Sequence, residues 1–129
     1  MSTTGFGILS FGAYLPRARL QRSVVAEANA WFAPGLKGLA KGERCIRNWD
    51  EDPITMAVEA ARDCLGERDR LSLSRLLLAS SSLPFGDRLN AGVVANALML
   101  PSGLRALDVA GSQRAGSGAL LEALEGGAA

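Results

Sequence analysis

The residues whose types and spacing suggest chemistry lie in one stretch, LRALDVAGSQRAGSGALLEAL, at residues 104–124. An apolar strand is expected to lead there into a turn of small and polar residues, followed by a helix. Such a turn points several backbone N–H groups at one place, and the helix dipole adds positive potential. A thiol placed there has a lowered pKa and becomes a nucleophile. The centre of this turn, however, holds Gln113, which is not a nucleophile.

The residues alone leave two interpretations of this turn open. Its glycines, at positions 111, 116 and 118, would let a substrate approach the backbone closely. The same small residues would equally suit tight packing of a helix on a sheet. A phosphate-binding P-loop is excluded because the pattern GxxxxGK[ST] is absent, and the AGSGA segment around Ser117 lies inside the expected helix rather than at a strand end.

The composition narrows the possible chemistry. The 129 residues are 48% hydrophobic and 21% charged, as in an ordinary globular protein, and the net charge of +1 gives no reason to expect nucleic acid as a partner. There is no histidine, so the commonest acid/base group at neutral pH is missing. Cys45 and Cys64 form no zinc-binding pattern, which predicts no metal and two reduced thiols.

The targeting signals also exclude some classes. The N-terminus has no basic region before its apolar residues, so no signal peptide is expected. No apolar run reaches the roughly 20 residues that span a bilayer. The sequence therefore predicts a cytoplasmic protein without membrane contact.

The elements that must position the turn follow from periodicity. Apolar runs predict strands at 6–16, 75–82 and 105–110. Helices are expected at 23–32, 52–66, 90–99 and 115–125, with a loop between the first two. Ser23 is expected to cap the first helix, with Val24, Ala28 and Trp31 on one face. Asp52 is expected to cap the second, with Pro53 in its first turn and Gly66 at its end.

This order predicts the fold class α/β, with a mixed, mainly parallel sheet and helices packed on it. Asp108, on the last strand, is interpreted as an ion-pair partner for Arg105 or Arg114 rather than as a catalytic carboxylate. The run RLLLASSS needs cover on both of its faces. If the chain stops at Ala129, apolar surface and a sheet edge would stay exposed, which predicts a homo- or hetero-oligomer.

Taken together, four segments resemble one known family: GILSFGAYLPRARL, ERCIRNWDEDPITMAVEAARDCL, LLLASSSLPFGDRLNAGVVANAL and DVAGSQRAGSGAL. They are similar to the N-terminal half of the thiolase superfamily, nearest to the hydroxymethylglutaryl-CoA synthase-like and 3-oxoacyl-carrier-protein synthase III-like branches. The resemblance implies a thiolase-like half-fold for residues 1–129, incomplete without a partner or further chain. It also implies coenzyme A or carrier-protein pantetheine as substrate handle, with no tightly bound cofactor.

The resemblance also assigns site residues and departs from the family at each. Gln113 stands where the family has its catalytic cysteine, and Ser81 where the synthases have a glutamate acid/base. Gly38 aligns with a nucleotide-binding arginine, with Lys37 beside it. Arg114 and Gly116 follow the turn and are further candidate substrate contacts. The family histidine belongs to the second half of the fold, beyond this chain.

Three explanations of Gln113 stay open: a pseudo-enzyme subunit of a heteromer, an engineered replacement, or drift. The leading functional hypothesis is a fragment or subunit of a thiolase-superfamily protein acting on acyl-CoA or acyl-carrier thioesters, through acyl transfer and Claisen-type chemistry, and inactive alone. One alternative is a non-catalytic structural partner of a heteromeric thiolase-like complex. Another is an unrelated small α/β domain whose glycine turn binds an anion.

Overall fold

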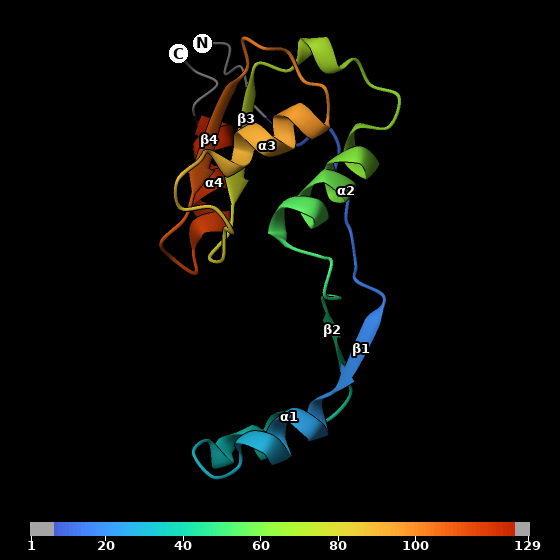
Figure 1. Ribbon diagram of the computed structural model, residues 1–129, viewed down its shortest axis with the longest axis vertical. Helices are drawn as coiled ribbons and strands as arrows, with labels where there is room; N and C mark the ends of the chain where they lie inside the picture. Colours follow the sequence, from blue (N-terminus) through green and yellow to red (C-terminus); the bar gives the residue numbers. More distant parts are fainter. Residues whose placement is uncertain (1–6, 126–129) are drawn as a thin grey trace. The chain divides into compact units, whose positions relative to one another are not determined.

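The computed structural model describes residues 7–125, which form two compact units (Figure 1). We call the first the parallel unit, described over residues 7–14 and 52–125, and the second, residues 15–51, the ribbon unit. Each is described by itself below. No helix among the described residues is long and apolar enough to cross a membrane. The assignment of residues 1–129 to one thiolase-like portion stays a prediction.

The parallel unit is built on a β-α-β crossover. Strand β3 (Arg75–Ala79) is followed by helix α3 (Asn90–Ala97) and strand β4 (Arg105–Val109). The strands pair in parallel, with Arg75 opposite Arg105 and Ala79 opposite Val109. A parallel pair needs such a crossover, because a short hairpin turn joins only antiparallel strands. The predicted α/β class with parallel pairing is therefore observed, although the predicted strands at 75–82 and 105–110 are shorter than expected.

Helices cover both faces of the β3–β4 pair. Leu76 and Leu78 pack against the core formed with helices α2 (Pro53–Leu65) and α3. Their neighbours at 75, 77 and 79 line a hollow against helix α4 (Ala115–Glu125). Alternate residues of a strand point to opposite faces, so α2 and α3 lie on one side of the pair and α4 on the other. The run RLLLA is apolar throughout because both of its faces are covered.

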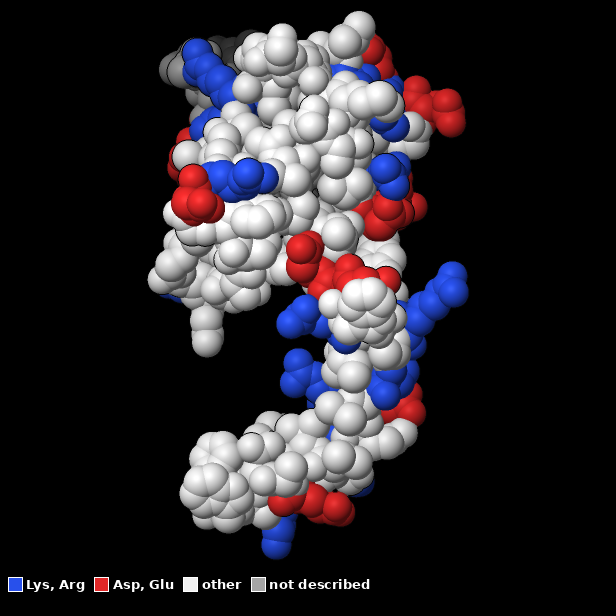
Figure 2. Space-filling model, in the orientation of Figure 1, with Lys and Arg blue, Asp and Glu red and all other residues white. Residues whose placement is uncertain are grey.

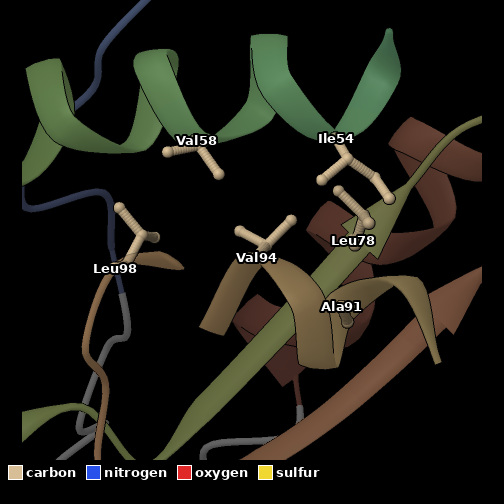
Figure 3. Close-up of a cluster of buried hydrophobic side chains, with 6 residues drawn as sticks. All are labelled: Ile54, Val58, Leu78, Ala91, Val94 and Leu98. Carbon is tan, nitrogen blue, oxygen red and sulfur yellow. The ribbon is translucent and has the colours of Figure 1, made fainter. Parts of the chain in front are cut away.

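The core of the parallel unit lies between α2, α3 and β3 (Figure 3). Side chains from α2 and the end of α3 point toward one another across it. The cluster contains six residues: Ile54, Val58, Leu78, Ala91, Val94 and Leu98. Burying such aliphatic side chains stabilises the folded state by about 1.5–3 kcal/mol each.

Helix α2 begins where the sequence predicts. The Asp52 carboxylate accepts the Thr55 backbone N–H at 2.7 Å, and the Thr55 hydroxyl oxygen accepts the Asp52 N–H at 2.8 Å. This reciprocal capping box satisfies N–H groups that the first turn leaves unpaired. Pro53 occupies the first turn and Gly66 ends the helix with a φ of +49°. All three predicted signals are confirmed.

The predicted first strand, at 6–16, is wrong over its described residues: positions 7–16 form no strand. The segment lies against α2 instead of pairing with a sheet. The Ala13 N–H donates to the Asp63 carboxylate at 2.9 Å, and the Ser10 hydroxyl donates to the Cys64 carbonyl at 3.1 Å. A β-carbon at Gly12 would lie 2.2 Å from the Cys64 backbone nitrogen, so only glycine permits this approach. Residue 6 lies outside the described residues.

Helix α3 is shorter than the predicted 90–99 because it ends in a Schellman motif. The Leu100 N–H donates to the Ala95 carbonyl at 2.9 Å, and the Met99 N–H donates to the Asn96 carbonyl at 3.0 Å. This motif requires a left-handed residue after the helix, usually glycine. Here Met99 takes that conformation, with a φ of 54°. The 3₁₀ turn η2 (Arg70–Ser72) lies between α2 and β3.

The ribbon unit contains the main differences from the predicted elements. Strands β1 (Ala18–Gln21) and β2 (Glu43–Ile46) pair antiparallel, and helix α1 (Arg22–Asn29) and the 3₁₀ helix η1 (Pro34–Leu39) lie between them. The predicted loop after the first helix thus contains η1 and leads into β2. These strands were missed because four-residue, half-exposed strands give little hydrophobic alternation.

Helix α1 also differs from the expected 23–32. It begins after Gln21, and Ser23 lies inside it rather than at its cap. The predicted apolar face is wrong, since Val24 and Trp31 are exposed and Ala26 is the buried residue. Val25 and Ala26 line a hollow with η1, which turns the helix to a different face.

Candidate functional site

The candidate site is the turn 110–114 between β4 and α4. Gly111 has a φ of +83°, a conformation that favours glycine. The Ser112 hydroxyl oxygen accepts the Arg114 N–H at 3.1 Å, and the Ser112 carbonyl accepts the Ala115 N–H at 3.1 Å. These bonds turn the chain from the strand into the helix within five residues. The predicted strand–turn–helix arrangement is thus observed.

Gln113 lies in the middle of this turn. The residue is exposed, and no hydrogen bond from its side chain to another described residue is present. It directly precedes the first turn of α4, an eleven-residue helix whose unpaired N–H groups carry a partial positive charge. Its carboxamide can therefore donate to or accept from a ligand that approaches the helix N-terminus.

Ser81 follows β3 and lies at the same sheet edge as the turn. Beyond the last paired residues, the Ser80 N–H donates to the Val109 carbonyl at 3.1 Å, so the two chains still run together where they leave the sheet. Parallel strands end at a common edge, which is where α/β proteins place their ligands. Ser81 and Gln113 therefore belong to loops that leave one edge. Ser81 is exposed, and its assigned role stays a prediction.

Asp108 does not fill the role predicted for it. Its carboxylate accepts the backbone N–H groups of Asn90 at 2.8 Å and Ala91 at 2.6 Å, and the Asn90 side-chain N–H at 2.9 Å. It thus caps helix α3 from strand β4, and the expected ion pair with Arg105 or Arg114 is absent among the described residues. The short spacing from β4 to the turn suggested an arginine partner, but the parallel register places α3 nearer.

Two opposing effects act on the pKa of Asp108. Burial raises it by penalising the charged form, while the hydrogen bonds from Asn90 and Ala91 lower it by favouring the carboxylate. The hydrogen bonds prevail, so the pKa of Asp108 lies below its ordinary value. The group stays ionised in neutral solution and is unsuited to act as a general acid.

The other predicted contact residues are divided between the two units. Arg114 and Gly116 are exposed at the start of α4, beside Gln113. Gly116 also lines the hollow between β3 and α4. Lys37 is exposed in η1 of the ribbon unit, so the structure does not bring it to the turn. Substrate roles for all three stay predictions.

The ribbon unit has its own hollow and its own charge. Figure 2 shows Lys and Arg side chains gathered around the β1–β2 ribbon, and residues 15–51 contain seven Lys or Arg against four Asp or Glu. A hollow of about 390 Å³ lies between α1, η1 and β2, with Arg22 and Arg44 beside apolar side chains. Cys45, which is exposed, and Cys64 are both free thiols. Across residues 7–125, no cluster of three or more potential metal-ligating side chains is present.

Known proteins show what this arrangement resembles. The hydroxymethylglutaryl-CoA synthase of Thermococcus sibiricus is 32% identical over 121 residues, which are 92% of this chain and 33% of that protein. A 3-oxoacyl-(acyl-carrier-protein) synthase III superposes over 95% of this chain and 39% of that one, with a TM-score of 0.76 and 27% identity. The chain is homologous to thiolase-superfamily synthases.

A third comparison agrees on the fold. MvaS in complex with 3-hydroxy-3-methylglutaryl coenzyme A superposes over 94% of this chain and 30% of that one, with a TM-score of 0.75 and 22% identity. No family model matches the chain. The chain spans about a third of the length of the curated relatives that it matches. The predicted superfamily and its α/β fold are confirmed, and the alternative of an unrelated small α/β domain is wrong.

Proposed function

We propose that this chain is the part of a thiolase-superfamily protein that receives an acyl-CoA or acyl-carrier thioester at the turn 110–114, and that Gln113 prevents it from taking the acyl group. The observation that carries the proposal is the position of Gln113, exposed between a parallel strand and a helix N-terminus. Relatives named as hydroxymethylglutaryl-CoA synthases, matched over 92% of this chain, support the thioester as ligand.

The chemistry of the side chain explains the inactivity. A thioester forms when a thiolate attacks an acyl carbonyl, and a carboxamide has no comparable nucleophile. Glutamine does reach about as far as an acylated cysteine, and its N–H groups can hydrogen-bond a carbonyl oxygen. The site would therefore bind a thioester and leave it intact. Acyl transfer and Claisen-type chemistry would belong to relatives that have the cysteine.

The remaining residues have supporting roles in this proposal. Ser81, in the position of the synthase glutamate, offers a hydroxyl that does not titrate near neutral pH and so does not replace that acid/base group. Arg114 and Lys37 would contact anionic groups of coenzyme A or of carrier-protein pantetheine, and Gly116 would leave room beside the helix. The ligand is a substrate handle rather than a tightly bound cofactor, and the protein is cytoplasmic.

The decisive experiment restores the nucleophile. Gln113→Cys is incubated with acetyl-CoA, and covalent acylation is located by mass spectrometry of tryptic peptides. Cleavage after Arg105 and Arg114 isolates position 113 in the peptide 106–114. We expect an acetyl adduct on that peptide in the variant and none in the unsubstituted chain.

Ser117→Cys is the matched control, because Ser117 is also exposed and lies on α4 but falls in the next tryptic peptide. The exposed thiol of Cys45 reports non-specific acylation in every sample. Equal labelling of the two introduced thiols and Cys45 would contradict the proposal. Binding of intact acetyl-CoA to the unsubstituted chain, measured by calorimetry, tests the ligand independently of the covalent step.

A second function, a non-catalytic structural partner of a thiolase-like chain, is favoured by exposed apolar surface. Within the described residues β3 and β4 pair only with each other, which leaves both outer edges open. Leu107 on β4 is 51% exposed, and Leu120 and Leu121 on α4 are 48% and 55% exposed. Surfaces of this kind seek a partner. Native mass spectrometry of the protein from its own source would reveal a homo- or hetero-oligomer, and a monomer that binds acetyl-CoA would contradict this role.

A further inference from the structure

A buried amide closes the loop that follows β3. Asn90 is 2% exposed. Its side-chain oxygen accepts the Phe85 N–H at 3.0 Å, and its side-chain nitrogen donates to the Phe85 carbonyl at 2.9 Å. One side chain thereby pairs both backbone groups of Phe85, as a neighbouring strand would. The segment between them is held in one compact loop.

The same asparagine is fastened to β4. The Asp108 carboxylate takes both the backbone and the side-chain N–H of Asn90, and the Ala91 N–H with its other oxygen. Two of the free N–H groups at the start of α3 are thus satisfied from a different element. We call the Asn90–Asp108 pair the clasp. It joins the loop after β3, which carries Ser81, to the strand that ends in the Gln113 turn.

We propose that the clasp is a positioning element of the candidate site, which holds loop 80–89 and turn 110–114 in one arrangement before a ligand arrives. The role of the site rests on the proposed function, whereas the coupling of the two loops does not. Asn90 and Asp108 are positioning residues, since they act through Phe85 and the start of α3 rather than on a ligand. Misplacement of about 1 Å in such a site can slow a reaction roughly a hundredfold.

A merely structural role would lower the stability of the whole unit and leave the turn unchanged. The experiment therefore compares Asp108→Asn and Asn90→Ser with Asp52→Ala. Asp52 is a matched control because its carboxylate also caps a helix, α2, but contacts no residue of the loop or the turn in any described hydrogen bond. Asn90→Ser retains every backbone donor, so it gives the same readings if Asp108→Asn does not fold.

Two measurements are made on each variant. Hydrogen exchange by mass spectrometry follows the backbone amides of 83–91, and we expect them to exchange at least about tenfold faster in the clasp variants than in Asp52→Ala, which corresponds to about one opening in ten being regained by the native bonds. In the Gln113→Cys background, the rate–pH profile of alkylation by iodoacetamide follows the introduced thiol. We expect that profile to move in the clasp variants and to stay in place in Asp52→Ala.

Equal acceleration of exchange at every amide, or an alkylation profile that does not move, would overturn the positioning role. Neither measurement needs a thioester. Failure of acetyl-CoA to acylate Gln113→Cys would therefore contradict the proposed function alone. Unchanged exchange at 83–91 would contradict the clasp alone.

Discussion

The parallel unit and the ribbon unit differ in how their elements are held. In the parallel unit three helices enclose a parallel strand pair, and a cluster of six aliphatic side chains is buried. In the ribbon unit, residues 15–51, Ala26 is the buried residue, while Trp31, Phe32, Leu39 and Trp49 are at least 60% exposed. Trp31 and Phe32 pack edge to face, with ring centroids 5.0 Å apart, rather than against a core. The ribbon unit is thus held mainly by local hydrogen bonds.

This difference has an energetic meaning. Apolar burial supplies most of the free energy that opposes chain entropy, so a segment with few buried side chains opens at low cost. The parallel unit positions Gln113 and Ser81, whereas the ribbon unit carries Lys37 and most of the basic residues. The residues proposed to act on the thioester therefore sit on the more rigid part.

The largest expected effect comes from the core. Leu98→Ala removes a side chain that is 1% exposed, and we expect it to lower the free energy of unfolding by about 2–5 kcal/mol. Leu39→Ala in the ribbon unit, where the side chain is 64% exposed, should change it by about 0.5 kcal/mol or less. Urea unfolding followed by circular dichroism gives both values. Similar losses in the two variants would remove the distinction between the units.

Hydrogen exchange tests the same contrast without substitution. Amides of α1 and β2 should open with a free energy at least about 2 kcal/mol below that of amides in α2 and α3, because few apolar contacts are broken. Mass spectrometry of peptic fragments measures this difference. Uniform protection across residues 15–51 and 52–98 would show that the ribbon unit is as stable as the core.

A smaller effect is expected from acid. Because the folded-state pKa of Asp108 is lowered, its contribution to stability is fully present above the unfolded-state pKa of about 3.9 and is lost as the pH falls through the folded-state value. The unfolding midpoint in urea should fall between pH 6 and pH 3. In Asp108→Asn, the part of that fall due to this carboxylate should be absent. An identical pH dependence in both proteins would show that the clasp is not a source of acid sensitivity.

The smallest expected effect is a gain. Met99 takes a left-handed conformation that costs a non-glycine residue about 1 kcal/mol, and its side chain is 75% exposed, so little packing would be lost. Met99→Gly should raise the free energy of unfolding by about 0.5–1 kcal/mol. Ser102→Gly, at an exposed position just beyond, is a control for glycine itself and should not stabilise. A loss on Met99→Gly would mean that the methionine side chain contributes packing.

The sequence predicted the parallel unit well because its elements carry local signals. Asp52, Pro53 and Gly66 bound α2, and the apolar run RLLLA marks a strand covered on both faces. The predicted helix 115–125 has the bounds of α4. In each case the residues that specify the element lie within it, so periodicity and capping suffice.

The failures share a different cause. Residues 7–16 are apolar and were expected to pair as a strand, but their partner is helix α2, which hydrophobicity alone cannot name. Asn90 gave no signal, because a buried asparagine and a solvated one look the same in sequence. Its role depends on Phe85 and on Asp108, eighteen positions away. The positions of Gln113, Ser81, Arg114, Gly116 and Lys37 are now described, but their roles stay predictions.

The close approach of Gly12 to α2 makes position 12 a sharp test of sequence tolerance. A β-carbon there would meet the backbone atoms of Cys64 and Ala60 at 2.2 Å and 2.5 Å, and backbone cannot step aside as a side-chain tip can. Neighbouring Phe11, 89% exposed, has no such restriction. In a saturation library sorted for folded protein, position 12 should retain a single amino acid, while position 11 beside it should retain nearly all twenty. The alignment of an entire N-terminal segment on its helix thus depends on one missing methyl group.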